Sequence, residues 1–182
     1  MIEVSEITIQ EFEEKIYNTY ITLFPKEEQR DWKKIKNSYN EGIEKFYKIS
    51  LDNNIIGFFM LEKLEDLPYY LDYFAVYKEY QNKGYGTKSL EKLLKDIIKE
   101  DGLIAEIEKI NDEDIITKRR FKFYENLGFT TVDRDYLLYD VLYNPIIYYK
   151  ENNKDKIDDI FFKYYEFNVG IENIKKHCKI IK

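Results

Sequence analysis

The sequence predicts an α/β fold, and three consecutive segments near the middle of the chain support that prediction. Tyr69–Tyr77 is a run of aromatic and apolar residues on both alternating sets of positions, which is typical of a strand covered on both faces. A polar loop follows and ends in Gly84 and Gly86. From Thr87 to Glu100, leucine and isoleucine recur at the spacing of an amphipathic helix. A buried strand therefore leads into a glycine loop, and the loop opens a helix.

This order of segments predicts an anion-binding loop. The first N–H groups of a helix have no partner within it, and the helix dipole favours a negative charge there. Glycine lets the backbone turn sharply and lets a phosphate come close. The loop is not a Walker A loop, because Lys88 and Ser89 follow Gly86 without the upstream glycine, and it is a poor dinucleotide fingerprint, because Ser89 replaces the third glycine. The alternative is a glycine loop that merely caps the helix.

The other predicted elements alternate between strands and helices. Predicted strands cover Met1–Ile9, Phe46–Leu51, Ile55–Leu64, Leu103–Ile110, Thr130–Val132 and Tyr136–Tyr149. Predicted helices cover Glu11–Leu23, Lys26–Tyr39, Thr117–Leu127 and Lys154–Phe167. The polar stretch Asp52–Asn54 predicts a tight turn, and Gly128 a left-handed helix end. The segment after Gly170 could form a short helix whose apolar side packs on this chain or on a second copy, so a homodimer stays open.

The composition predicts one globular domain over residues 1–182, in which residues 153–182 form a C-terminal helical extension. The chain has 182 residues, of which 44% are hydrophobic and 35% charged. Its net charge of -6 argues against a general nucleic-acid binder. No apolar stretch approaches the roughly 18 residues of a membrane span, and the first residues lack the layout of a signal peptide.

Cysteine and histidine usage narrows the chemistry further. Cys178 is the only cysteine and His177 the only histidine in the sequence. One cysteine excludes an internal disulfide framework and suits a reducing cytoplasm, where we expect the protein. A His/Cys metal site needs more ligands than these two residues supply, so no metal is expected. A Ser/His or Cys/His hydrolase would have to use this tail histidine, which we do not expect.

Two motifs resemble the GNAT family of N-acetyltransferases. Gln81, Gly84 and Gly86 match the family motif Q/R-x-x-G-x-G/A, and they lie between an apolar strand and an amphipathic helix, as in that family. Further along, the segment Phe123–Phe129 resembles the family's Y-E-x-x-G-F sequence. The resemblance extends over roughly Phe46–Phe129, and the motifs occur in the family's order.

The resemblance implies a GNAT fold, with a mixed and mostly antiparallel central sheet of about six to seven strands flanked by helices. It implies acetyl-CoA, or a related acyl-CoA, as donor, with the pyrophosphate on the N–H groups of the glycine loop. The main-chain N–H of Val76 would polarise the thioester carbonyl. The residues implied in donor binding are Phe74, Ala75, Val76, Gln81, Asn82, Lys83, Gly84, Tyr85, Gly86, Thr87 and Tyr124.

Direct acetyl transfer needs a base, because an alkyl ammonium with a pKa of about 10 must lose a proton before it attacks. The candidates are Asp72 on the central strand and Glu106 and Glu108 on the next strand, since carboxylates brought together would raise one pKa. Some family members carry the base at the position of Tyr70, so the assignment stays open among the three carboxylates. For the two glutamates the alternative is a wet strand face that binds lysines.

Tyr124 matches the family tyrosine that lies near the sulfur of CoA. Its phenol would protonate the departing thiolate, and the alternative is a core tyrosine. Thr117 stands where many relatives carry an asparagine, and the segment Lys109–Ile116 is longer than the usual connection.

The sequence therefore predicts an N-acetyltransferase that moves an acetyl group from acetyl-CoA to a primary amine by direct attack. The acceptor is a small amine or a peptide amine, and it stays open among aminoglycosides, polyamines, amino acids and protein N-termini. Neither nucleic acid nor membrane is an expected partner. The alternative is an acyl-CoA-binding regulatory module with little or no turnover.

Overall fold

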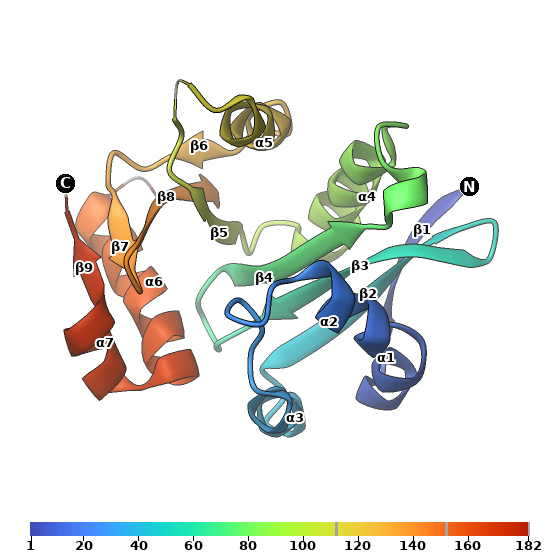
Figure 1. Ribbon diagram of the computed structural model, residues 1–182, viewed down its shortest axis with the longest axis horizontal. Coiled ribbons are helices and arrows are strands. Elements are labelled where there is room, and N and C mark those ends of the chain that lie inside the picture. The colour runs from blue at the N-terminus through green and yellow to red at the C-terminus, as the bar shows by residue number, and fades with distance from the viewer. Residues whose placement is uncertain (112, 152, 182) are drawn as a thin grey trace. The chain divides into compact units, whose positions relative to one another are not determined.

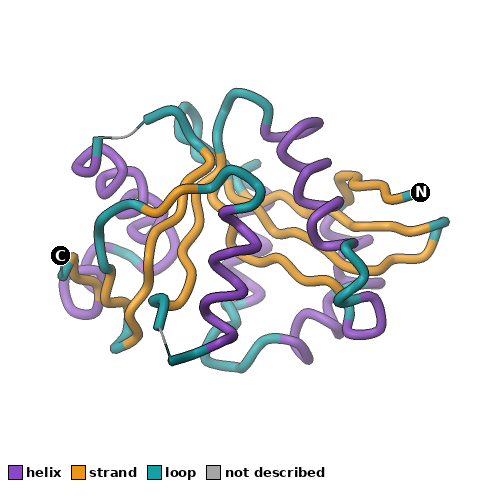
Figure 2. The backbone as a smooth tube through the Cα atoms, turned by 90° about the horizontal axis from the view of Figure 1, so that it is seen from above, coloured by secondary structure: helices purple, strands orange, loops and turns teal. Residues whose placement is uncertain are grey.

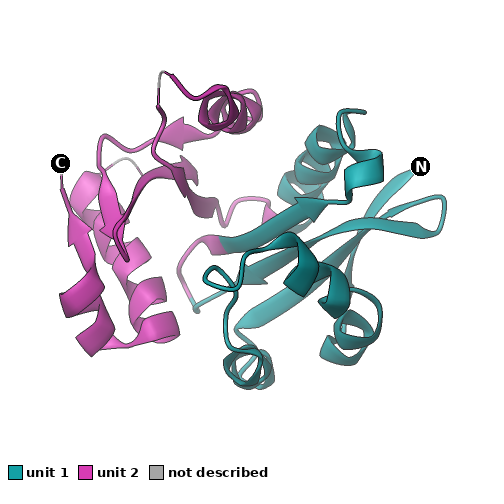
Figure 3. Cartoon of the chain, in the orientation of Figure 1, with its two compact units in different colours: residues 1–65, 71–97 teal, residues 66–70, 98–182 magenta. Residues whose placement is uncertain are grey.

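The computed structural model describes residues 1–111, 113–151 and 153–181 (Figure 1). The chain divides into two compact units (Figure 3). Unit 1 contains residues 1–65 and 71–97, and unit 2 contains residues 66–70 and 98–182. The single domain expected over residues 1–182 stays a prediction.

Unit 1 is built on strands that follow the order β1-β2-β3-β4. The strands are β1 (Ile2–Ile7), β2 (Glu44–Leu51), β3 (Asn54–Glu62) and β4 (Tyr69–Val76). β1, β2 and β3 lie side by side and pair antiparallel (Figure 2). The predicted turn between β2 and β3 is present, with left-handed backbone at Asp52 (φ 49°) and Asn53 (φ 68°). Asparagine and aspartate tolerate this conformation because their short polar side chains bond locally.

Helices cover the two faces of this sheet (Figure 1). The helices are α1 (Ile9–Lys15), α2 (Tyr17–Leu23), α3 (Trp32–Asn40) and α4 (Tyr85–Leu93), and α4 continues into a π turn, η2 (Leu94–Ile98). The first three pack on one face, where Phe12, Ile16 and Ile35 join Phe46 and Phe58 in a buried core. This core fixes the side of the sheet on which the connection between α2 and α3 lies.

Two helix predictions in unit 1 were wrong in extent. The predicted helix Glu11–Leu23 is divided at Ile16, whose backbone (φ -123°) separates α1 from α2. The predicted helix Lys26–Tyr39 begins only at Trp32, because the carboxylate of Asp31 accepts the amide N–H of Lys34 and caps α3. Residues 24–31 are therefore free to form a connection rather than a helix.

Unit 2 contains the first residues of β4 and the strands that follow it in the chain. The first residues of β4 pair in parallel with β5 (Leu103–Glu108), and β5 pairs antiparallel with β8 (Val141–Tyr148). β8 also pairs with β6 (Thr130–Thr131) and β7 (Tyr136–Leu138), and β7 pairs with β9 (Cys178–Ile180). The single strand predicted over Tyr136–Tyr149 was wrong, because Tyr139 and Asp140 turn the chain with left-handed backbone (φ 47° and 68°).

Three helices complete unit 2, namely α5 (Ile115–Glu125), α6 (Lys154–Val169) and α7 (Ile171–His177). The predicted C-terminal extension is not helical throughout, since it ends in strand β9, which adds to β7. The predicted apolar side of the last segment is partly buried, at Ile174 and Cys178, and partly exposed, at Ile171 and Ile181.

The predicted fold class is confirmed: the structure is an α/β fold with a mixed and mostly antiparallel sheet flanked by helices. The described residues form nine strands, where six to seven were expected. The larger number reflects the β7–β8 hairpin and the short strands β6 and β9. Within the described parts of the chain, no helix combines the length and apolar character that crossing a bilayer requires.

Candidate functional site

The end of β4 comes unusually close to β3. A Cβ atom placed on Gly57 would lie 2.3 Å from the main-chain oxygen of Ala75 and 3.1 Å from the Cα atom of Val76. Only glycine fits such an approach without displacing the backbone. Phe74 is held by stacking on Phe59, with ring centroids 4.4 Å apart. The backbone of three predicted binding residues, 74–76, is therefore set by its contact with β3.

The loop after β4 closes on itself through side chains. The side-chain amide of Gln81 donates to the main-chain oxygen of Val76 (2.8 Å), and the amine of Lys83 donates to the main-chain oxygen of Glu79 (2.8 Å). Between them a short 3-10 turn, η1 (Lys78–Tyr80), begins the loop, and Asn82 is left-handed (φ 59°). Gln81 and Lys83, which are predicted to bind the donor, thus also stabilise the loop's shape.

The start of α4 has the geometry expected of an anion site. Gly84 precedes the helix in the left-handed conformation (φ 76°), and a Cβ atom there would meet nothing within 4 Å. Lys88 donates its amide N–H to the main-chain oxygen of Gly84 (3.2 Å). Tyr85, Gly86 and Thr87 come before that bond, in the first turn, where N–H groups have no helical partner. These amides can bind an anion at an open helix terminus.

Asp72 lies in a cluster of charged residues in unit 1. Nη1 of Arg30, from the α2–α3 connection, lies 2.5 Å from Oδ2 of Asp72. The same nitrogen lies 2.8 Å from a carboxylate oxygen of Glu44 on β2 and 2.8 Å from one of Glu62 on β3. The side chains of both glutamates are fully buried, and that of Asp72 is 12% exposed. Three adjacent strands thus direct carboxylates at one guanidinium.

This arrangement shifts protonation in the cluster. Burial raises the pKa of Asp72, although the charge of Arg30 acts against that shift. Burial raises the pKa of Glu44 well above its usual range, against the attraction of Arg30, and the charges of Asp72 and Glu62 add to the rise. Burial alone would lower the pKa of Arg30, but the surrounding carboxylates raise it further above its usual value. One guanidinium cannot neutralise three carboxylates, so the cluster retains a proton more readily than its isolated groups would.

Tyr124 is fixed at the end of α5. Its main-chain oxygen accepts the amide N–H of Phe129 (3.1 Å), and Gly128 donates to the main-chain oxygen of Glu125 (3.0 Å). With Gly128 left-handed (φ 89°), these bonds form the helix end that its glycine predicted. The Tyr124 ring packs edge-on against Phe129 at 5.2 Å. Burial raises the pKa of Tyr124 to about 12, so its phenol keeps its proton at neutral pH.

The two glutamates of β5 have different surroundings within unit 2. Oε1 of Glu106 accepts the hydroxyl of Tyr70 at 2.5 Å. The carboxylate of Glu108 instead forms an ion pair with Arg120 on α5, 3.1 Å apart, and both side chains are nearly half exposed. Glu108 therefore fits the wet strand face that the sequence left as an alternative, with arginine in place of lysine. The approach of these glutamates to Asp72, which belongs to unit 1, stays a prediction.

Sequence reasoning missed Arg30, Glu44 and Glu62. Arg30 lies in a run of charges, Lys26–Lys34, that resembles a solvated helix face. Glu44 lies two residues before the predicted strand Phe46–Leu51, and Glu62 lies two residues before the end of the predicted strand Ile55–Leu64, where a charge is common. The apolar neighbours of Asp72 were the one available indication, because a lone charge in a buried strand needs a partner.

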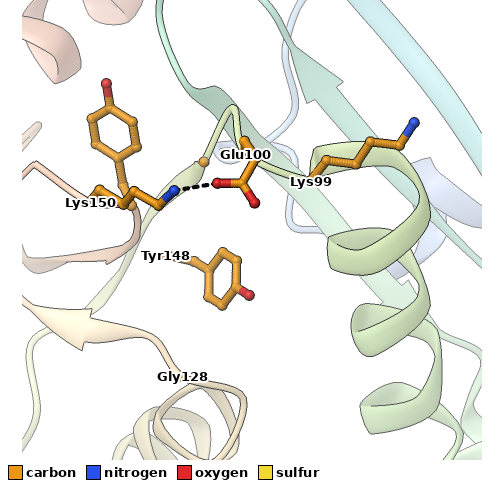
Figure 4. A pocket seen from close by; sticks show the side chains of 7 residues that line it. Lys99, Glu100, Gly128, Tyr148 and Lys150 are labelled. Carbon is orange, nitrogen blue, oxygen red and sulfur yellow. Dashed lines mark hydrogen bonds and ion pairs between the residues drawn. The ribbon is translucent and has the colours of Figure 1, made fainter.

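Unit 2 also contains a hollow of about 270 Å³. Its lining consists of Lys99, Glu100, Gly102, Gly128, Tyr148, Tyr149 and Lys150. In Figure 4 an ion pair joins Lys150 to Glu100, and Lys99 points away from that pair. None of the predicted donor-binding or catalytic residues lines this hollow, so the hollow carries no part of the predicted chemistry.

Comparison with known families gives one match. The sequence model of the acetyltransferase (GNAT) family matches residues 10–129, about two thirds of the chain. The match includes β4, the glycine loop, α4 and Tyr124. No curated protein matches the chain significantly.

Solved structures resemble the chain over most of its length. A protein from Bacteroides thetaiotaomicron that is assigned to the GNAT acetyltransferases has a TM-score of 0.80 at 23% identity, over 93% of this chain and 99% of that one. The ribosomal-protein-S18-alanine N-acetyltransferase from Escherichia coli has a TM-score of 0.59 at 16% identity, over 81% of this chain and 92% of that one. A Bacillus anthracis protein assigned as a streptothricin acetyltransferase, in complex with acetyl coenzyme A, has a TM-score of 0.56 at 19% identity, over 82% and 99%. At these identities the likeness shows the fold.

Proposed function

The chain belongs to the acetyltransferase (GNAT) family, and from that premise we propose that it transfers an acetyl group from acetyl-CoA to a primary amine by direct attack. The observation that carries the proposal is the opening of α4. Gly84 is left-handed and faces open space, and the first-turn amides of the helix follow it. This geometry fits a pyrophosphate, and a solved structure of the same fold contains acetyl coenzyme A.

In this proposal the amides of Tyr85, Gly86 and Thr87 bind the pyrophosphate, with Asn82 and Lys83 beside them. Phe74, Ala75 and Val76 line the donor's thioester end, where the amide N–H of Val76 stabilises negative charge on the carbonyl oxygen. Acetyl-CoA, when bound, supplies the activated acetyl group. The side-chain amide of Gln81 donates a hydrogen bond to the main-chain oxygen of Val76. This bond helps hold the backbone at Val76 in one orientation.

We propose Glu106 as the base among the three candidate carboxylates. Proton uptake would weaken the ion pair of Asp72 with Arg30 and that of Glu108 with Arg120. Glu106 instead accepts a hydrogen bond from the phenol of Tyr70, a neutral donor that a carboxylate can exchange for its own proton. Asp72 then serves to hold the α2–α3 connection on the sheet. Glu108 serves to hold α5.

Tyr124 is the proposed acid. Its phenol donates a proton to the sulfur of the departing CoA thiolate, while the attacking amine loses its proton to Glu106. Burial raises the pKa of Tyr124 to about 12, which keeps the proton on the phenol until negative charge develops nearby.

The test is thiol release from acetyl-CoA in the presence of a panel of primary amines, with acetyl-CoA binding measured separately by calorimetry. The panel contains an aminoglycoside, a polyamine, free amino acids and a peptide with an N-terminal alanine. Amine-dependent release supports the proposal and identifies the acceptor class. Binding of acetyl-CoA without release for any amine supports an acyl-CoA-binding regulatory module instead. Absence of binding contradicts the assignment of the loop.

A further inference from the structure

Glu106 is held by a tyrosine from the neighbouring strand. The hydroxyl of Tyr70 donates to Oε1 of Glu106 at 2.5 Å. That length is typical of an O–H donor bonded to an ionised carboxylate, and such bonds are about twice as strong as neutral ones. β4 and β5 pair in parallel at this point, with Tyr70 opposite Ile104, so Glu106 lies two residues further along β5. Backbone pairing therefore sets the two side chains at bonding distance.

The C-terminal helix α6 fixes the ring of Tyr70. Tyr164 stacks on it with centroids 5.1 Å apart and an interplanar angle of 20°. Phe161 and Tyr165 meet it edge-on, at 6.4 Å and 6.5 Å. The hydroxyl of Tyr164 also donates to the main-chain oxygen of Pro68 (2.6 Å), which fixes the chain just before Tyr70. Both the ring and the backbone of Tyr70 are thus constrained by α6.

Three other titratable groups that act on Glu106 stay uncharged at neutral pH, because the pKa of each is raised. Burial raises the pKa of Tyr165 well above its usual value, and the charge of Glu106 and a side-chain hydrogen bond with it raise that pKa further. Burial and the bond to Asp158 raise the pKa of Tyr136 on β7. Burial also raises the pKa of Cys178 on β9, again with a contribution from Glu106.

We propose that Tyr70, held by the C-terminal helix α6, is a positioning residue that keeps the Glu106 carboxylate ionised and aimed for proton uptake from the acceptor amine. This inference rests on the proposed function, and it extends the catalytic machinery to residues 154–169. The C-terminal segment is then a part of the active enzyme rather than an appendage. It also gives a role to Tyr70, which stands where some family members carry the base.

The test is the substitution Tyr70→Phe, which removes the hydroxyl and keeps the ring. Losing a hydrogen bond to its ionised form makes the Glu106 carboxyl easier to protonate. The acidic limb of the pH profile of kcat/KM is therefore expected to move up by about one to two pH units. Activity should recover at high pH, where Glu106 is ionised in both proteins. A fall in activity by the same factor at every pH, with no movement of the limb, would overturn the proposal.

Tyr164→Phe is the matched control. It also removes one buried tyrosine hydroxyl from the same group of rings, but that hydroxyl bonds Pro68 and the stacking on Tyr70 is kept. We expect Tyr164→Phe to lower the free energy of unfolding about as much as Tyr70→Phe does, because each loses one buried hydroxyl. The acidic limb of the Tyr164→Phe profile should stay where it is in the wild type. If Tyr164→Phe moves the limb as far as Tyr70→Phe does, the effect reflects general loosening and the positioning role is refuted.

A second readout needs no turnover. The protein is labelled with ¹³C at glutamate carboxyls, and the resonance lost in Glu106→Gln assigns Glu106. Tyr70→Phe should raise the titration midpoint of that resonance, and an unchanged midpoint refutes the hydrogen bond. A raised midpoint with an unmoved acidic limb refutes Glu106 as base. If no amine is acetylated by the wild-type protein, the proposed function and the catalytic part of the inference fail together, while this titration still decides the Tyr70–Glu106 bond.

Discussion

Arg30 and Asp72 form an ion pair with Nη1 and Oδ2 at 2.5 Å, and this pair joins the α2–α3 connection to the central strand. The backbone supports it. The amide N–H of Arg30 lies 3.1 Å from the hydroxyl of Tyr20 and 3.2 Å from that of Tyr73, and Tyr73 donates to the main-chain oxygen of Glu28. The connection is therefore anchored to β4 by both its backbone and its one arginine.

Replacing Arg30 by methionine should destabilise unit 1 severely. The substitution leaves Glu44, Glu62 and Asp72 near one another without the guanidinium, and removing one partner of a buried ion pair costs about 3–5 kcal/mol. Urea unfolding followed by the fluorescence of Trp32, the only tryptophan, measures the change in unit 1.

The control for that substitution is Arg120→Met. Arg120 forms a similar ion pair with Glu108, but both side chains are nearly half exposed. Exposed pairs contribute at most about 1 kcal/mol, so the loss, followed by circular dichroism, should be small. Equal losses for the two substitutions would show that the Arg30 cluster contributes no more than a surface pair.

The cluster should also make stability depend on pH. Burial raises the pKa of Glu44 above its value in the unfolded chain, so the folded protein binds the proton more tightly. The stabilisation from that proton is complete below the unfolded pKa and is lost as pH rises through the folded pKa. Glu44→Gln keeps the shape and removes the titration. The unfolding free energy of the variant should therefore fall less between pH 5 and pH 8 than that of the wild type.

An exposed glutamate provides the comparison. The hydrogen bond from Lys36 lowers the pKa of Glu13, so this group stays ionised in both states above pH 5. Glu13→Gln should shift the unfolding free energy by a constant amount across the same pH range. The raised pKa of Glu44 is contradicted if the unfolding free energies of the Glu44 and Glu13 variants depend on pH in the same way as that of the wild type.

The difference between what the sequence predicted and what it missed follows from the distance over which each feature forms. The β4–loop–α4 order could be predicted because Gln81, Gly84 and Gly86 act on their own neighbours in the chain. Gly128 predicted the end of α5 for the same reason. Each signal combines a local backbone requirement with a residue type that meets it.

The surroundings of the carboxylates could not be predicted in this way. Arg30 meets Asp72 across 42 residues, and Tyr70 meets Glu106 across 36. These pairs depend on which strands become neighbours and in which register, and periodicity alone contains no such information. The break between α1 and α2 at Ile16 could not be predicted, because neither glycine nor proline stands there. The turn at Tyr139 was missed because tyrosine seldom adopts left-handed backbone.

Gly57→Ala should disturb the proposed donor site through the backbone. The added methyl group would lie 2.3 Å from the oxygen of Ala75, so the end of β4 must move. Overpacking of this kind costs about 1–3 kcal/mol. Because Val76 is proposed to bind the thioester carbonyl, we expect acetyl-CoA to bind about tenfold more weakly or worse. Calorimetric titration with acetyl-CoA measures the affinity, and thermal unfolding measures the stability.

Gly42→Ala separates these two effects. Gly42 is left-handed (φ 79°), and a Cβ atom there would meet nothing within 4 Å, so alanine adds strain of about 1–2 kcal/mol without a clash. The variant should lose stability and keep its affinity for acetyl-CoA. Equal affinities for the two alanine variants would contradict a binding role for the β3–β4 contact.

Tyr124→Phe should slow the chemical step and leave donor binding intact. The substitution removes the proton that the phenol gives to the leaving thiolate, and general acid catalysis contributes about 10²-fold or more. The ring still packs on Phe129, so the fold should be retained.

Tyr148→Phe is the control, because Tyr148 also packs near Phe129, at 5.6 Å, but has no proposed role in the chemistry. We expect kcat for thiol release to fall in Tyr124→Phe alone, with an unchanged calorimetric Kd for acetyl-CoA. An unchanged kcat would remove Tyr124 as the acid, and a weakened Kd with unchanged kcat would reassign its phenol to donor binding.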